Sequence, residues 1–134
     1  KTVFCQYEFV FSVFIFYQVS ACAAYIESVR PIGASVTVVS ATALNLTVSA
    51  RVSVDAATSL AAVKARFEKD LAAYLKSIAF EKSEVVYARV GFLLLDIVGV
   101  TDYSDLLLNG KTQNVTVGST QIPIASEVTL SAAT

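Results

Sequence analysis

The stretch from Ser83 to Gly110 constrains the fold most, because it holds signals for a helix, a strand and a tight turn in one short segment. Ser83 can cap a helix by accepting a hydrogen bond from a free backbone N–H, and Glu84 suits the positive end of the helix dipole. Apolar residues then recur at helical spacing at Val86, Val90, Leu93, Leu94 and Ile97. We therefore expect a helix that begins at Ser83 and buries one face.

Glycines punctuate this stretch at three points. Gly91 interrupts the helical pattern, where glycine costs about 1 kcal/mol relative to alanine, so it predicts the close approach of another backbone. Gly99 is expected to end the helix in the left-handed conformation. Asn109–Gly110 is typical of a tight turn after the strand that follows.

Three segments, in this order, resemble the C-terminal part of the Baseplate J-like family. They are AAYIESVRPIGASVTVVSATA, LAAYLKSIAF and RVGFLLLDIVGVTDYSDLLLNG, and the likeness covers roughly residues 20–130. The family builds the wedges of contractile phage tail baseplates and of related phage-derived injection machines. The resemblance implies a structural protein of the virion tail baseplate, assembled in the bacterial host cytoplasm, whose partners are other copies of itself and other baseplate proteins.

The charge pattern gives no sign of nucleic-acid or membrane binding. Ten basic and 11 acidic side chains give a net charge of −1, and no basic cluster stands out. The two cysteines, Cys5 and Cys22, have no histidine or further cysteine partners, so a zinc site is not expected. A disulfide between them and a pair of reduced thiols both fit the sequence.

The sequence also predicts no catalysis, no cofactor and no small-molecule substrate. Histidine is absent, which removes the commonest general base and an ordinary catalytic triad. Asp96, Asp102 and Asp105 form the only local carboxylate cluster. Asp96 belongs to the expected helix, whereas Asp102 and Asp105 fall on opposite faces of the expected strand, so the three need not converge.

The first 19 residues form an atypical apolar segment, rich in aromatic and β-branched side chains. A cleaved signal peptide and a segment foreign to the domain both remain open, whereas the run is shorter than the about 20 apolar residues of a transmembrane helix. Residues 20–33 are expected to be a helical connector that ends at the Pro31–Gly33 corner. Residues 34–134 are expected to form the baseplate-J-like domain. If the first 24 residues are a signal, the alternative is a small secreted or surface binding domain.

The central part of the chain predicts a strand followed by a helix. Every even position from Leu44 to Val54 is apolar and the odd positions from Asn45 to Ser53 are polar or small, which indicates a long strand with one buried face. A shorter strand is expected at residues 36–39. Thr58 or Ser59 then caps a helix with apolar residues at Leu60, Val63, Phe67, Leu71, Tyr74 and Ile78.

The C-terminal part predicts three short strands, at residues 115–117, 122–124 and 128–130. Together these features predict an α+β fold, with two helices packed on a largely antiparallel sheet and a small C-terminal β-meander. The short strands carry few charges, and an open sheet edge is a template for another chain, so we expect self-association through them. The interface candidates are Tyr103, Val115, Val117, Ile122 and Ile124.

Overall fold

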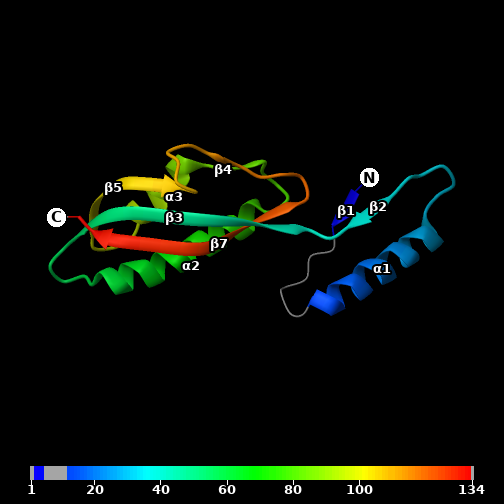
Figure 1. Cartoon of the computed structure of the whole chain (residues 1–134), viewed down its shortest axis with the longest axis horizontal. Helices are drawn as coiled ribbons and strands as arrows, with labels where there is room; N and C mark the ends of the chain where they lie inside the picture. Colours follow the sequence, from blue (N-terminus) through cyan, green and yellow to red (C-terminus); the bar gives the residue numbers. More distant parts are fainter. Residues whose placement is uncertain (1, 5–11, 134) are drawn as a thin grey trace. The chain divides into compact units, whose positions relative to one another are not determined.

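The computed structural model describes residues 2–4 and 12–133. The chain forms two compact units, Lys1–Thr42 and Ala43–Thr134, which are described separately (Figure 1). The division differs from the predicted boundaries at residues 19 and 33, which remain predictions. Cys5 lies outside the described residues, so the choice between a disulfide and two reduced thiols stays open, and Cys22 is half-buried.

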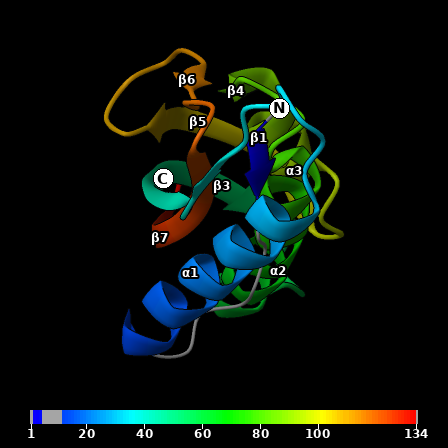
Figure 2. The ribbon, with the colours of Figure 1, turned by 90° about the vertical axis from the view of Figure 1, so that its right-hand side faces the viewer.

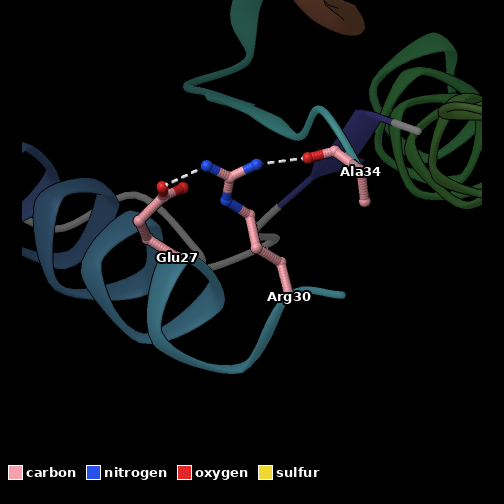
Figure 3. Close-up of polar contacts among 3 residues, drawn as sticks. All are labelled: Glu27, Arg30 and Ala34. Carbon is pink, nitrogen blue, oxygen red and sulfur yellow. Dashed lines mark hydrogen bonds and ion pairs between the residues drawn. The ribbon is translucent and has the colours of Figure 1, made fainter. Parts of the chain in front are cut away.

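The first unit contains one helix and a pair of short strands. Helix α1 (Ser12–Val29) includes the helical part of the predicted connector and starts before it. Strands β1 (Thr2–Phe4) and β2 (Thr37–Val39) pair in parallel. At the corner after α1, the Arg30 guanidinium donates to the Glu27 carboxylate and to the Ala34 carbonyl (Figure 3). This side chain ties the last turn of the helix to the chain beyond Pro31.

The second unit is built on a three-stranded sheet in the order β5–β3–β7. Its strands are β3 (Thr42–Val54), β5 (Val100–Leu108) and β7 (Gln121–Ala132). β5 pairs with β3 in the antiparallel direction, whereas β7 runs in the same direction as β3 (Figure 1). The α+β class is confirmed, with a mixed sheet in place of the largely antiparallel one that the sequence predicted.

Two helices cover one face of this sheet, α2 (Leu60–Ile78) and α3 (Tyr87–Leu95). Figure 2 shows both helices on one side of the strands, with α2 packed against β7 and α3 against β5. The alternation in β3 is confirmed, because Leu46, Val48, Ala50 and Val52 are all buried. The periodicity of α2 is also confirmed, since Val63, Phe67, Leu71 and Ile78 are buried. The core of the unit therefore lies between the apolar face of β3 and the two helices.

One of the two predicted helix caps is confirmed and the other is wrong. Ser59 caps α2 as one of the two expected candidates, with its Oγ accepting from the Ala62 N–H at 3.3 Å. Ser83 does not cap α3, which begins at Tyr87 with Val86 at the cap position. Residues Glu84–Val85 instead form strand β4, which pairs with β6 (Val115–Thr116). A strand ladder with a distant segment replaces the first helical turn that the sequence predicted.

The Asn109–Gly110 turn is confirmed, Gly99 has the expected positive φ but does not end the helix, and Gly91 is required for a different reason than predicted. Asn109 and Gly110 both have positive φ angles, 50° and 74°, and Leu108 and Lys111 exchange backbone hydrogen bonds across them. Gly99 has a φ of 92°, although α3 ends before it, at Leu95. A Cβ atom at Gly91 would lie 2.3 Å from Tyr103 Oη. A tyrosine side chain, and not another backbone, therefore occupies the space that Gly91 leaves free.

The predicted C-terminal β-meander is wrong. β6 leaves the main sheet to pair with β4, and the two expected strands at 122–124 and 128–130 are parts of the single strand β7. β7 lies beside β3, where Ser126 Oγ donates to the Leu46 carbonyl at 3.2 Å and the Ala133 N–H donates to the Val52 carbonyl at 3.0 Å. The segment is continuous because β3 offers one long neighbour to pair with.

Candidate assembly surface

The three predicted carboxylates do not converge on a common site. Asp96 is the C-cap residue of α3, and Asp102 accepts the N–H of the adjacent Tyr103 at 2.8 Å. Asp105 has a φ of 51° at an irregularity in β5, and its carboxylate lies 3.4 Å from Arg51 on β3. Across the described part of the chain, no three acidic or cysteine side chains are close enough to hold a metal ion. The carboxylates of Asp102 and Asp105 thus make separate local contacts, and Asp96 takes part in the helix end through its backbone N–H.

Of the five predicted interface residues, Val117 belongs to the core and two others pack against it. Val117 is only 5% exposed, and Val115 is partly buried against the core. Tyr103 also packs against the core, with its ring directed at Gly91. The sequence did not separate these residues from surface residues, because a short strand with alternating apolar side chains looks the same in a core and at an edge. Val117 is therefore buried away from any partner, whereas Val115 and Tyr103 are partly exposed and their place in an interface stays a prediction.

The other two predicted residues, Ile122 and Ile124, lie on β7 at the edge of the sheet. Ile122 is half-buried, whereas Ile124 is 41% exposed. Four consecutive residues, from Ile124 to Glu127, are exposed. Because the strand order is β5–β3–β7, β7 has a neighbouring strand on one side only within the described chain. β7 therefore presents a long sheet edge.

The opposite edge, formed by β5, is protected. The β3–β5 pairing has two register shifts, and Asp102 and Asp105 are both exposed on this strand. The Tyr103 N–H is already occupied by the Asp102 carboxylate. Charges and bulges are the usual means by which proteins prevent edge strands from pairing with other chains. The two edges of one sheet thus differ in how open they are to a partner strand.

An apolar patch at the end of α3 was missed by the sequence analysis. Phe92, Leu95 and Val98 are 50%, 47% and 92% exposed, and the Arg89 guanidinium lies 5.1 Å from the centre of the Phe92 ring. An open depression of about 300 Å³ lies next to Val98, with Thr58, Arg66 and Asp96 in its lining. Exposed apolar groups that are rimmed by polar ones are typical of contact surfaces.

The sequence did contain a signal for this patch. Val90 and Leu94 fill the buried face of α3, so Phe92 and Leu95 fall on another side of the same helix. A helix that is apolar on more than one face needs more than one covering surface. None of the helices among the described residues is long and apolar enough to cross a membrane.

The sequence matches one protein family and is similar to two proteins of Bacillus subtilis. The family described as "Baseplate J-like protein C-terminal domain" matches residues 46–131. The chain is similar to the phage-like element PBSX protein XkdT of Bacillus subtilis (strain 168), with 30% identity over 102 residues, which is 76% of this chain and 29% of XkdT. It is also similar to the uncharacterized protein YqbT of the same strain, with 31% identity over 104 residues, which is 78% of this chain and 30% of YqbT. The chain thus spans about 30% of the length of these curated relatives.

Proposed function

The chain belongs to the Baseplate J-like family and carries its C-terminal domain, and from this premise we propose that it is a wedge component of a contractile phage tail or of a related injection machine. The family is a family of structural phage baseplate proteins, which supports a place in a tail baseplate. The finer role is the proposal: the domain acts by binding other baseplate proteins and further copies of itself, after synthesis in the host cytoplasm, and catalyses no reaction.

The observation that carries this proposal is the agreement between the family match and the fold. The matched residues, 46–131, fall inside the compact unit Ala43–Thr134. Among the residues whose burial the structure describes, the buried apolar ones also lie inside that match, from Leu46 to Val128. The chain therefore contains the family domain with its own core, as an assembly module requires.

The same unit supports a role in contact rather than in chemistry. Its distinctive surface features are the open edge of β7 and the apolar patch of Phe92, Leu95 and Val98, and both are suited to protein partners. The carboxylates of Asp102 and Asp105 make an adjacent backbone N–H contact and an ion pair, and Asp96 ends helix α3 through its backbone N–H. We propose that assembly uses the two surface features, with Ile124 as the predicted interface residue that remains accessible.

The test is to delete the coding region from the host that carries the phage or phage-like element, and to examine induced particles by electron microscopy and mass spectrometry. We expect the protein in wild-type particles, and no complete baseplates after the deletion. Complementation with the wild-type gene and with an Asp102→Asn variant should restore assembly equally, because the proposed role is not catalytic. Recovery of the protein from the medium with an N-terminus near Ala24, and its absence from particles, would contradict the proposal.

A further inference from the structure

We propose that the outer edge of β7 pairs with an extended segment of a different protein, and that this segment carries a lysine or arginine opposite Glu127. The inference rests on the proposed assembly role and names the surface and the kind of partner. It starts from the edge itself: β7 is 12 residues long and is the outermost strand of the sheet in the described chain. An edge strand offers a row of backbone donors and acceptors that a second strand can satisfy.

The contrast between the two edges selects β7. β5 has two register shifts, exposed carboxylates at Asp102 and Asp105, and a backbone N–H already bonded to a side chain. β7 carries one exposed charge, Glu127, and its contacts from Ser126 to Leu46 and from Ala133 to Val52 place it beside β3 in the parallel direction. Pro123 lacks a backbone N–H and limits pairing at the start of β7. The open part of the edge is therefore Ile124 to Ala132.

The single charge on β7 decides between a second copy and a different protein. Glu127 is exposed and makes no ion pair with any described residue. It lies near the middle of Gln121–Ala132, so antiparallel pairing of two full β7 strands about a two-fold axis would bring the two Glu127 carboxylates opposite or diagonal to each other on one face. Like charges at such positions are destabilising, whereas an opposite charge is favourable. A strand with a basic residue at that position fits this edge better than a second β7.

The chemistry of the neighbouring side chains agrees with a strand as the occupant. Around Glu127 the exposed side chains are Ile124, Ala125, Ser126 and Thr129. These are small or β-branched apart from the one carboxylate, and such side chains tolerate a close neighbour on the same face of a sheet. Recognition would thus come from main-chain hydrogen bonds, with the Glu127 charge setting the register.

The experiment places a photo-crosslinking benzophenone side chain at position 129 on β7 of the full chain, in assembled particles, with the same group at position 104 on β5 as the matched control. Thr129 and Ser104 are both exposed in this structure. We expect position 129 to form a covalent link to one defined segment of another baseplate protein, and position 104 to form none. A link from position 129 to a second copy of this chain, or the same yield from both positions, would overturn the proposal.

A charge reversal tests the basic partner. Glu127→Lys should lower incorporation into particles about tenfold, because an attraction across the pair becomes a repulsion. Glu68→Lys, a matched reversal on the exposed face of α2, should stay within about twofold of wild type. Circular dichroism of both free variants checks that the fold is kept. Equal incorporation of the two variants would exclude the charged pairing, while the presence of the wild-type protein in particles would still support the baseplate role.

Discussion

At the scale of single residues, Tyr87 links helix α3 to strand β5. Its hydroxyl donates a hydrogen bond to the Leu106 carbonyl at 2.9 Å. Burial raises the pKa of Tyr87 above its ordinary value of 10.0, and the neighbouring Tyr103 raises it further. The raised pKa means that the folded state prefers the neutral phenol, which is the form that can donate to Leu106.

The pKa of Tyr87 predicts how stability depends on pH in the alkaline range. Below a pH of about 10, both the folded and the unfolded chain hold the proton, so the contribution of Tyr87 is fully present. As the pH rises further, the unfolded chain loses the proton first, and the free energy of unfolding falls until the folded-state pKa is passed. Denaturant unfolding at a series of pH values should show a shallower alkaline loss for Tyr87→Phe than for wild type. Identical slopes would contradict the prediction.

Glycine is required at position 99 for two reasons, its backbone conformation and a close neighbouring side chain. Its φ of 92° is unfavourable for a residue with a side chain, and a Cβ atom there would lie 2.0 Å from Thr58 Oγ1. The glycine thus permits both the turn after α3 and the contact with the segment that leads into α2. The sequence indicated the turn, whereas the contact with Thr58 depends on the packed structure.

At the scale of elements, the start of α3 is held by groups from distant parts of the chain. The Tyr87 N–H donates to Asn114 Oδ1 at 2.9 Å, and the Val86 N–H donates to Tyr74 Oη at 3.2 Å. Asn114 Nδ2 also donates to the Glu84 carboxylate at 3.2 Å. The backbone N–H groups of Val86 and Tyr87 are therefore satisfied by helix α2 and by a loop, in place of a local side-chain cap.

This arrangement predicts that Asn114 stabilises α3 more than Ser83 does. Asn114→Ala should lower the free energy of unfolding by about 0.5–2 kcal/mol, the usual cost of losing a helix cap. Ser83→Ala is the matched control and should change it by less than about 0.5 kcal/mol, because the exposed Ser83 side chain does not cap the helix. Chemical denaturation of the two variants measures both values. A larger loss of stability for Ser83→Ala than for Asn114→Ala would contradict this prediction and support Ser83 as the helix cap.

At the scale of the whole molecule, the second compact unit contains the family domain and its core. The buried apolar side chains run from Leu46 to Val128, and they join β3, both helices and β5 in one cluster. The helices bury their apolar faces against the sheet, which is the arrangement that lets a two-layer unit stand alone. The unit Ala43–Thr134 has the size of a small independent domain.

We therefore predict that residues 43–134 fold without the first unit. The fragment should unfold in one cooperative transition, because its core is a single cluster. Circular dichroism and thermal melting provide the measurement, with a Leu94→Ala variant of the fragment as a check on the core. That variant should lose about 2–5 kcal/mol of stability, since Leu94 is fully buried. A fragment without a cooperative transition would show that the unit depends on residues 1–42.

The sequence by itself determined the elements whose signals are local. The alternation in β3, the helical spacing in α2 with its Ser59 cap, and the Asn109–Gly110 turn depend on residues that are neighbours in the chain. Side chains of neighbouring residues meet in fixed patterns along a strand or a helix, so these elements could be read without any knowledge of the fold.

Only the tertiary structure decided where elements compete for partners far away in the sequence. Residues Glu84–Val85 form a strand and not a helical turn because Val115–Thr116 lies beside them. Residues 121–132 form one strand and not part of a meander because β3 provides a continuous neighbour, 80 residues away where Ser126 contacts Leu46. The same packing buries Val117 and leaves Phe92 exposed. Backbone groups must find hydrogen-bond partners, and which distant segment supplies them depends on how the whole chain is packed.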